Sequence, residues 1–377
     1  MPNNKHIHLC LAKMSPTGAE QRYIQEAFDT NWVAPLGPNV DAFEKALEEY
    51  IGSDRHVAAL SSCTAAIHLA LLLLGVGKND EVICQSMSFC ASTHPVTYCG
   101  AKPVLVDSET ETWNMSPELL ETAIKDRIAK TGRKPKAIIV VDLYGMPAHW
   151  DAIEAIAKRY EIPVIEDAAN AMGSRYQGRM CGTFGNIATL SFNGNKMITT
   201  SGGGALICHD EETKRRAVFL ATQARENALH YQHEVIGYNY RMSNICAGIG
   251  RGQMTVVNDH IAHHKHVHQL YSELLGDLVK ANPNQDYDSN FWLSTITFEK
   301  ELDVTALCQA LNANGIEARP LWKPMHLQPV YKDAPAYVNG VSERLFKTGI
   351  CLPSGPWVTD EDVGFIVDCI KAAKVGS

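Results

Sequence analysis

The sequence predicts an α/β protein in which a mostly parallel central sheet is covered by helices, with a smaller α+β domain at the C-terminal end. Over the first two thirds of the chain, short β-branched runs alternate with helix-like segments. After about residue 210 the pattern changes to long helical stretches. The third observation is the length: 377 residues, 45% of them hydrophobic, provide enough chain for one large and one smaller domain.

Five short apolar runs predict the buried strands of the sheet. Strands covered by helices on both faces are rich in Val, Ile and Leu, and the alternation with helices favours parallel pairing. The runs are EVICQS (81–86), PVLVD (103–107), AIIVVDLYG (137–145), IPVIEDAA (162–169) and ATLSF (188–192).

Apolar residues recur about every 3.6 positions between these runs, which predicts helices over 64–75, 116–130 and 149–161. Ser116, followed by Pro117, has the pattern of an N-cap with proline at the first helical position.

The C-terminal part has its own pattern, and we expect the large domain to cover 1–250 and the small domain 251–377. The expected elements are helices over 211–225 and 243–276, a strand in 291–299, a helical segment within 304–320, and a final helix from about Asp360.

Charge and cysteine content argue against several classes of binding partner and against two kinds of cysteine site. The net charge is −8 and no long basic run occurs, which argues against nucleic acid or an anionic membrane as the main partner. The eleven cysteines form no CxxC pair, which favours free buried thiols over disulfides or a zinc ribbon. The first thirteen residues contain no apolar stretch of signal-peptide length. We therefore expect a soluble, cytoplasmic protein.

Polar residues follow several predicted strands, at the edge where α/β sheets bind ligands. Asp167 ends one strand, Phe89 follows another, and the segment 191–196 follows a third. The segment SSCTAA (61–66) precedes a helix, whose first N–H groups can bind an anion. Taken singly, these residues also fit a helix cap, a core aromatic and a surface lysine.

Lys196 lies in SFNGNKMITTSGGGAL (191–206). The residues around it do not fit either of two common phosphate-binding motifs. A P-loop has its glycines before the lysine, whereas here Gly202 to Gly204 follow it. A dinucleotide fingerprint opens a helix, whereas these glycines open the strand-like ALICHD. The remaining interpretation is a Schiff-base lysine, which together with an acid and a phosphate anchor describes pyridoxal phosphate (PLP) chemistry.

An ordered set of motifs along nearly the whole chain resembles the DegT/DnrJ/EryC1/StrS family of sugar-nucleotide aminotransferases, which are fold-type I, aspartate aminotransferase-like PLP enzymes. The motifs are TNWVAPLGPNVDAFE (30–44), SSCTAAIHLAL (61–71), SMSFCAS (86–92), IEDAANAMGS (165–174), SFNGNKMITTSGGGAL (191–206), GYNYRMSN (237–244) and CLPSG (351–355). Within the family, 222–244 and 317–326 are most similar to the bacillosamine-pathway 4-aminotransferases.

The resemblance implies a catalytic pair and a ring site. Lys196 forms the Schiff base with PLP and then moves the proton, while Asp167 pairs with the pyridine N–H. Phe89 stacks on the ring. Many relatives carry Gln, His or Glu where this chain has Asn170, so Asn170 is expected only as a cofactor neighbour.

The resemblance also implies how the phosphate is held. The amides of Cys63 and Thr64 and the hydroxyl of Ser191 bind it, with Asn193 among the cofactor-binding residues. Asn239 is expected to reach the phosphate from the partner subunit, which makes a homodimer with shared active sites.

The expected lining of the sugar-nucleotide site is less closely tied to motifs. One group is a loop near the N-terminus, one is a segment expected at the dimer interface, and one is a C-terminal loop. The residues are Asn31, Trp32, Val33, Ala34, Arg225, His230, Tyr231, Arg319, Trp322, Lys323 and His326.

The implied reaction moves an amino group from L-glutamate, through pyridoxamine phosphate, to C4 of a UDP-linked 4-keto-6-deoxy-N-acetylhexosamine. The alternatives are a 3- or 4-aminotransferase for a GDP- or dTDP-linked keto sugar and, less in keeping with the residues, a non-enzymatic PLP-binding protein.

A histidine series lies outside these motifs. His260, His264 and His268 recur at i, i+4 and i+8, which is compatible with a metal site. No carboxylate or cysteine completes a ligand set at suitable spacing, so a solvated helix face is favoured and no metal is expected.

Overall fold

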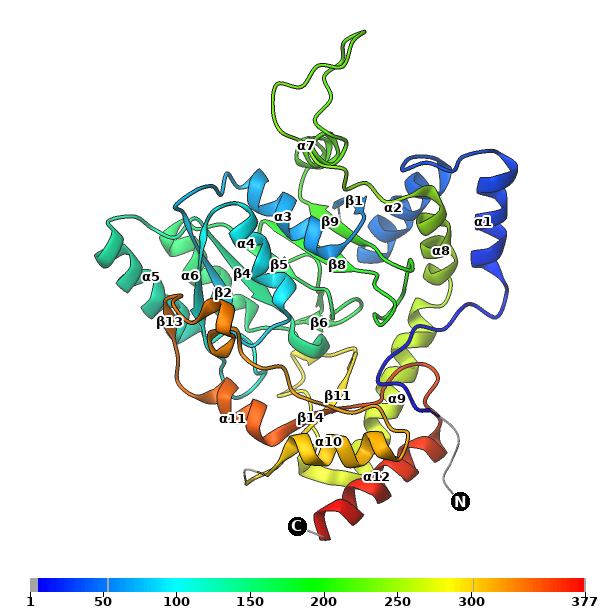
Figure 1. Cartoon of the computed structure of the whole chain (residues 1–377), viewed down its shortest axis with the longest axis vertical. Coiled ribbons are helices and arrows are strands. Elements are labelled where there is room, and N and C mark those ends of the chain that lie inside the picture. Colours follow the sequence, from blue (N-terminus) through cyan, green and yellow to red (C-terminus); the bar gives the residue numbers. More distant parts are fainter. Residues whose placement is uncertain (1–5, 53, 301, 376–377) are drawn as a thin grey trace.

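The computed structural model describes residues 6–52, 54–300 and 302–375, and its centre is an eight-stranded sheet (Figure 1). The strand order is β1-β9-β8-β5-β4-β2-β3-β13. The strands are β1 (His56–Leu60), β2 (Glu81–Gln85), β3 (Lys102–Val106), β4 (Ala137–Val141), β5 (Val164–Asp167), β8 (Ile187–Ser191), β9 (Gly204–Cys208) and β13 (Ala336–Tyr337). Only β9 pairs antiparallel with its neighbours, β8 and β1, so the mostly parallel sheet is confirmed.

Helices cover both faces of this sheet. Successive side chains along β4 show this, because they belong alternately to two core clusters. Ile138 and Val140 belong to one core cluster, whereas Ala137 and Ile139 belong to another. The first cluster includes side chains of α2 (Pro38–Ile51), α5 (Pro117–Thr131) and α6 (Trp150–Tyr160). The second includes side chains of α3 (Cys63–Leu73), α4 (His94–Tyr98) and α7 (Glu211–Ala221). Side chains that alternate along a strand point to opposite faces, so the sheet lies between two helical layers.

The five predicted strands are all present, with ends that differ by a few residues. The predicted N-cap is also confirmed, because the Ser116 hydroxyl accepts a hydrogen bond from the Leu119 N–H (3.3 Å). Such a bond satisfies one of the N–H groups that the first turn of a helix leaves without an intrahelical acceptor.

The C-terminal part forms a second, three-stranded sheet in the order β11-β14-β12. Its strands are β11 (Ser294–Thr297), β14 (Gly349–Leu352) and β12 (Arg319–Pro320). A third core cluster joins this sheet to α9 (Val257–Leu275), α10 (Val304–Ala313) and α12 (Asp360–Val375). The remaining elements are α1 (Ala19–Asp29), α8 (Asn244–Met254), α11 (Val341–Thr348) and a small sheet of β6 (Arg175–Tyr176), β7 (Arg179–Met180) and β10 (Tyr287–Asp288).

Two predicted helices differ from those observed. The single helix expected over 243–276 is two helices, because the backbone at Val256 (φ −124°, ψ 7°) leaves the helical region between α8 and α9. The helix expected over 211–225 ends at Ala221. The division at residue 250 falls inside α8 and stays a prediction.

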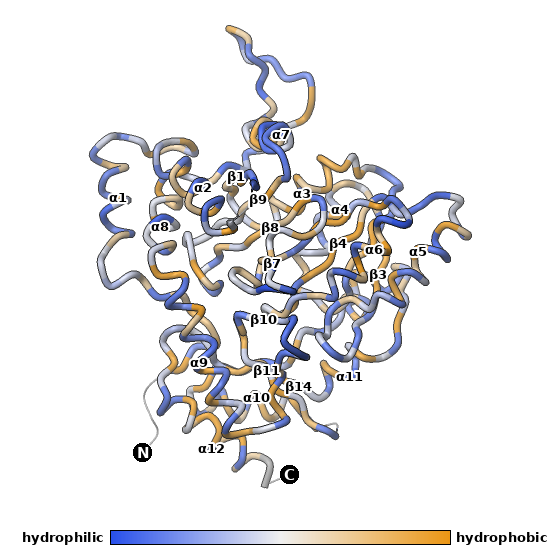
Figure 2. The backbone as a smooth tube through the Cα atoms, turned by 180° about the vertical axis from the view of Figure 1, so that it is seen from behind, coloured by the Kyte–Doolittle hydropathy of each residue, from blue (hydrophilic) through white to orange (hydrophobic). Residues whose placement is uncertain are grey.

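A long loop follows α7 and projects from the body of the molecule in both views (Figures 1 and 2). Its most exposed apolar residues are Leu229, Tyr231 and Ile236, whose exposures relative to an extended chain are 106%, 78% and 82%. No helix among residues 6–52, 54–300 and 302–375 is long and apolar enough to cross a membrane.

Candidate active site

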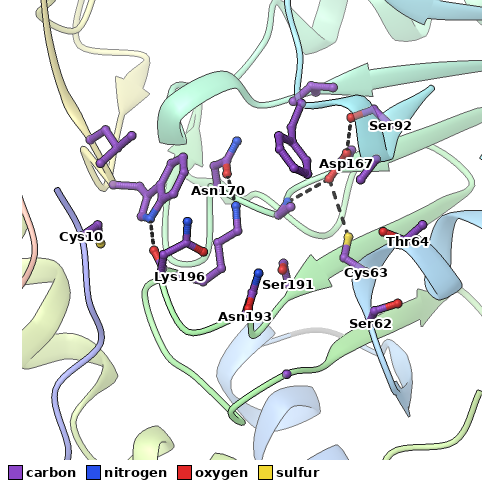
Figure 3. Close-up of a pocket in the computed structure, with 18 of the residues that line it drawn as sticks. Cys10, Ser62, Cys63, Thr64, Ser92, Asp167, Asn170, Ser191, Asn193 and Lys196 are labelled. Carbon is purple, nitrogen blue, oxygen red and sulfur yellow. Dashed lines mark hydrogen bonds between the residues drawn. The ribbon is translucent and has the colours of Figure 1, made fainter. Parts of the chain in front are cut away.

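A cavity of about 600 Å³ lies at the carboxyl ends of β5 and β8, beside the first turn of α3 (Figure 3). This is the edge of the sheet at which ligands of α/β proteins bind. The predicted site residues that line it are Cys63, Thr64, Phe89, Asp167, Asn170, Ser191, Asn193, Lys196, Arg319 and Trp322.

Lys196 follows β8 in a turn that several parts of the chain hold in place. Its N–H donates to the Asn193 carbonyl (3.0 Å), and the Trp292 indole donates to the carbonyl of Asn195 (2.6 Å). The Nζ atom donates to Asn170 Oδ1 (2.6 Å) and lies 4.1 Å from the centre of the Trp292 ring. Burial lowers the pKa of Lys196, although the Asp167 carboxylate opposes this shift. A lysine with a lowered pKa is more often neutral, and the neutral amine is the nucleophile.

Asp167 ends β5 and is only 3% exposed. Its Oδ2 accepts a hydrogen bond from the Ser92 hydroxyl (2.6 Å), and its Oδ1 accepts one from the Ala169 N–H (3.1 Å). Burial raises the pKa of Asp167, while the Ser92 bond lowers it. A buried carboxylate of this kind is a partner for a cationic N–H group that enters the cavity.

The first turn of α3 lies directly against the start of β9. Ser62 caps the helix by accepting a hydrogen bond from the Ala65 N–H (3.0 Å), and the next N–H groups, those of Cys63 and Thr64, have no intrahelical acceptor. Gly204, which pairs with Ser191 in the sheet, lies so close that a Cβ atom there would be 2.3 Å from the Cys63 nitrogen. The absent side chain therefore lets the strand, the Ser191 hydroxyl and the helix start meet around one small space, which suits a phosphate.

Aromatic rings form the far wall of the cavity. The Phe89 ring is 57% exposed, although large apolar side chains are usually covered. Its centre lies 5.9 Å from the Trp322 ring, which in turn packs against Tyr144 (4.7 Å). The exposed face of Phe89 is available to a planar ring placed between Asp167 and Lys196.

Comparison with known proteins agrees with this geometry. Residues 16–371 match the family described as DegT/DnrJ/EryC1/StrS aminotransferases. The chain belongs to this family.

Two relatives and one solved structure indicate the activity. EpsN of Bacillus subtilis (strain 168), whose name describes it as a pyridoxal phosphate-dependent aminotransferase, is 47% identical over 97% of this chain and 95% of its own length. GDP-perosamine synthase of Escherichia coli O157:H7 is 36% identical over 95% and 96%. The sugar aminotransferase Spr1654 of Streptococcus pneumoniae in its PLP form superposes with a TM-score of 0.89 at 25% identity, covering 99% of each chain.

The chain is thus a PLP-dependent sugar aminotransferase with a fold-type I architecture. The residues around the cavity fit this cofactor: a lysine with a lowered pKa, a buried carboxylate, an open aromatic face and a helix start that a Cβ at Gly204 would obstruct.

The remaining predicted residues of this aminotransferase lie away from the cavity of the single chain. The loop 31–34 lies between α1 and α2, with Trp32 and Val33 exposed. The His326 imidazole hydrogen-bonds the Ser86 hydroxyl (2.7 Å), and Lys323 is outside the lining. The residues that belong to the projecting loop or follow it are Arg225, His230, Tyr231 and Asn239, all exposed.

Several lining residues were not among the predicted site residues. Ser92 is hydrogen-bonded to Asp167, but although it ends the motif SMSFCAS (86–92), nothing in the sequence indicates which residue it contacts. Trp292, Glu317 and Cys10 reach the cavity from distant parts of the chain. Only the packing of the C-terminal sheet and the N-terminal segment brings them to Lys196, so no local spacing signals them.

The expectation of a solvated histidine face on α9 is wrong. His260, His264 and His268 are buried, with exposures of 6%, 0% and 6%. His260 Nδ1–H donates to the Met197 carbonyl (3.0 Å), and the His268 ring stacks on Phe291 at 3.5 Å. Burial lowers the pKa of His264 to about 3 and that of His268 to about 4, so these side chains are neutral core residues behind the turn of Lys196.

Proposed function

We propose that this enzyme transfers the amino group of L-glutamate to C4 of a UDP-linked 4-keto-6-deoxy-N-acetylhexosamine, giving the UDP-4-amino-4,6-dideoxy-GlcNAc of bacillosamine-type biosynthesis. The observation that carries the chemistry is the position of Lys196 Nζ, which has a lowered pKa and shares one cavity with the buried Asp167 carboxylate.

Five of the residues that line the cavity have positions that support a role in holding PLP. PLP, when bound, supplies an electrophilic carbon that joins the amine and a ring that withdraws electrons. The Asp167 carboxylate accepts a hydrogen bond from the ring nitrogen and keeps that nitrogen protonated. The Cys63 and Thr64 N–H groups and the Ser191 hydroxyl bind the phosphate, and Phe89 covers one face of the ring.

Lys196 moves the proton. When its Nζ carries no bond to the cofactor, Lys196 would be a free base inside the cavity, since burial lowers its pKa. It removes the proton from the carbon that loses the amino group and returns a proton to the carbon that gains one. Asn170, whose Oδ1 accepts a hydrogen bond from Nζ (2.6 Å), orients the amine for this transfer.

The C-terminal wall supports a sugar nucleotide as acceptor. Arg319 and Trp322 line the cavity, and a guanidinium beside an aromatic ring suits a diphosphate attached to a base. The Arg319 guanidinium already has an acid partner, Glu317 (3.0 Å), which orients it.

A GDP-linked keto sugar is the second candidate. It is favoured by the 36% identity to GDP-perosamine synthase over nearly the whole chain. Discrimination between uracil and guanine depends on residues at the nucleotide end of the site, beyond the cofactor cavity.

The experiment that separates the two candidates is an assay of the PLP-loaded enzyme with UDP-, GDP- and dTDP-linked 4-keto sugars and L-glutamate. We expect kcat/KM for the UDP sugar to exceed the others by at least about 10²-fold, since a site built for one base leaves polar groups unpaired with another. Before the sugar is added, glutamate alone is expected to bleach the visible band of the lysine-linked cofactor. Equal or greater activity with the GDP sugar would replace the proposed substrate without affecting the transaminase chemistry.

We also propose that two copies form a homodimer in which the projecting loop and Asn239 complete the site of the partner. The support is that Asn239, Arg225 and Tyr231 are exposed in the single chain, and that Leu229 and Ile236 expose apolar surface beside them. Apolar side chains this exposed are typical of a surface that another molecule covers.

Mixing two inactive variants tests this arrangement. Lys196→Ala removes the nucleophile and Asn239→Ala weakens the phosphate site, so each alone is expected to lose activity, the first by about 10³-fold or more. In a mixed dimer one site has both Lys196 and Asn239, so denaturing and refolding the two together is expected to restore about a quarter of the wild-type sites. A mixture no more active than its components would contradict the shared site.

A further inference from the structure

The side chain of Glu166 points away from the cavity, into a buried cluster with Asp142 and Cys181. Asp142 and Glu166 are both fully buried, at 0% exposure, and Cys181 is 2% exposed. One carboxylate oxygen of each acid and the Cys181 Sγ lie within 4.8 Å of one another.

The hydrogen bonds of the two carboxyls are unequal. Glu166 Oε1 accepts from the Gly182 N–H (2.6 Å) and Oε2 from the Phe184 N–H (2.7 Å). Asp142 Oδ1 accepts from the Ala148 N–H and the Trp150 indole, both at 2.9 Å. Asp142 Oδ2, by contrast, is buried without a hydrogen-bond partner.

Two carboxylates cannot both stay ionised side by side in a dry core, because their repulsion adds to the cost of burial. A proton on Asp142 Oδ2 removes the repulsion and converts the unpartnered acceptor into a donor toward Glu166. Asp142 Oδ2 is the free position for this proton, since both Glu166 oxygens already accept N–H bonds.

We propose that Asp142 and Glu166 share one proton in the folded protein, and that the pair acts as positioning residues for the strand end that carries Asp167. Glu166 precedes Asp167 in β5, and the Asp142 N–H donates to the Asp167 carbonyl (3.2 Å). The proton therefore joins the ends of β4 and β5 behind the catalytic carboxylate. This second part rests on the proposed role of Asp167, whereas the shared proton does not.

Other ionisable groups around the pair do not replace the proton. Burial raises the pKa of both carboxyls, and it raises that of the Cys181 thiol well above its usual value, so the thiol stays neutral. Arg175 faces the Cys181 side and Arg55 the Glu166 side. The Arg55 guanidinium donates to the Thr183 carbonyl (2.9 Å), and Arg175 donates to the Gly178 carbonyl (2.9 Å).

The shared proton determines how the stability of the folded protein depends on pH. Burial and the neighbouring carboxyl raise the pKa of the pair in the folded chain, whereas unfolded aspartate and glutamate have pKa values of about 4. Between these values the folded state holds a proton that the unfolded state has released. This part of the stability is therefore present at low pH and is lost as pH rises through the folded pKa.

Asp142→Asn tests the shared proton, because its amide can present a permanent N–H where the acid presents O–H. We expect the thermal midpoint of the cofactor-free variant to exceed that of wild type by about 2–4 °C at pH 8 and to equal it near pH 4. Glu166→Gln places an N–H₂ against the Gly182 or Phe184 N–H and is expected to lower the midpoint at every pH. Asp142→Ala is expected to lower the thermal midpoint. Asp277→Asn, at an exposed carboxyl, is the control, and it is expected to change neither the thermal midpoint nor its dependence on pH.

Retention of PLP after gel filtration is the second measurement. We expect wild type to lose cofactor faster as pH rises from 6 to 9, and Asp142→Asn to lose it less steeply. If the midpoint of Asp142→Asn stays at or below that of wild type at pH 8, or if one equivalent of metal co-purifies with wild type but not with Asp142→Asn, the shared proton is refuted. If the midpoints behave as expected but PLP retention has the same pH dependence in both proteins, only the positioning role fails.

Discussion

At the scale of single residues, Ser92 links the short turn after Phe89 to the buried Asp167 carboxylate. Replacing Ser92 by Ala removes the 2.6 Å hydrogen bond to Asp167 Oδ2, which currently lowers the pKa of that buried acid. The variant is expected to bind PLP more weakly by about 1.5–3 kcal/mol, the usual value of a hydrogen bond to a charged group. Equilibrium titration with PLP measures this.

Ser88→Ala is the matched control for Ser92→Ala. Ser88 is also buried, but its hydroxyl donates to the Gln85 carbonyl and makes no bond to the cofactor site. If both variants lose the same affinity, the Ser92 effect reflects general loosening of the segment rather than the bond to Asp167.

Some residues of the site could be predicted from the sequence, and others could not. The positions of Lys196 and Asp167 could be predicted because Asp167 ends and Lys196 follows a recognisable strand within a motif, and the sheet brings strand ends together. Trp292 could not, because its contact with Lys196 depends on how the C-terminal sheet docks. The burial of the α9 histidines could not be predicted for a related reason: their spacing shows that they share a face, but not which elements cover that face.

At the scale of elements, the first turn of α3 and the start of β9 form one unit. Gly204→Ala would place a Cβ atom 2.3 Å from the Cys63 nitrogen, so the helix start must move. We expect a loss of about 1–3 kcal/mol in the free energy of unfolding, together with weaker PLP binding because the phosphate N–H groups shift. Chemical denaturation and PLP titration provide the two readouts.

Gly202→Ala is the control within the same run of glycines. A Cβ at Gly202 meets no atom within 4 Å, so its effects are expected to be small. An equal loss in both variants would mean that the run needs backbone freedom, not the close approach at Gly204.

Strand positions were predictable because apolar runs of this length are distinctive, whereas helix ends were less so. The break at Val256 lies in the β-branched run Thr255 to Val257, but such residues also occur inside helices, so composition does not locate it. The antiparallel direction of β9 was likewise absent from the pattern, because a buried strand has the same composition in either direction.

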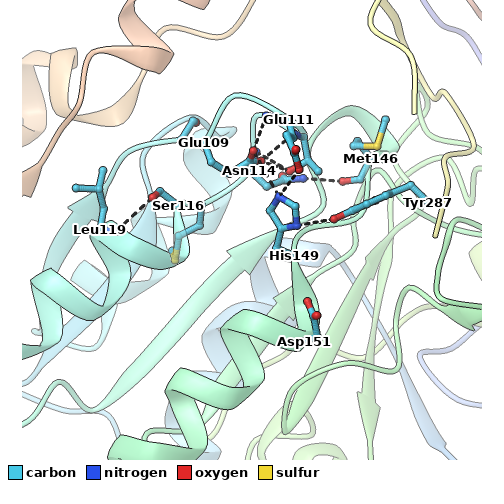
Figure 4. Close-up of polar contacts among 12 residues, drawn as sticks. Glu109, Glu111, Asn114, Ser116, Leu119, Met146, His149, Asp151 and Tyr287 are labelled. Carbon is cyan, nitrogen blue, oxygen red and sulfur yellow. Dashed lines mark hydrogen bonds and ion pairs between the residues drawn. The ribbon is translucent and has the colours of Figure 1, made fainter. Parts of the chain in front are cut away.

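At the scale of the whole molecule, a charged cluster joins the loop after β3 to α6 and β10 (Figure 4). His149 Nε2 lies 3.5 Å from Glu109 and 3.4 Å from Glu111, and its Nδ1 lies 2.5 Å from the Tyr287 hydroxyl. The Glu109 carboxylate raises the pKa of His149 above its ordinary value.

A raised histidine pKa gives stability that is fully present below the unfolded pKa of about 6.5 and is lost as pH rises through the folded value. His149→Gln is therefore expected to lower the thermal midpoint most below pH 6, with a smaller difference at pH 9. Tyr287→Phe removes the hydroxyl contact but not the charge, so its effect is expected to be similar at all pH values. Parallel pH profiles for wild type and His149→Gln would show that the imidazolium contributes nothing.

The short strand β13 has a consequence for how substrates reach Lys196. Residues 321–335, in orange in Figure 1, run from β12 in the small sheet to β13 at the edge of the large one and carry Trp322 along the cavity wall. The Met325 N–H also donates to the Ser86 carbonyl (2.8 Å). This segment is a strap fixed at both ends and in the middle. We therefore expect the two sheets to keep their spacing through the catalytic cycle.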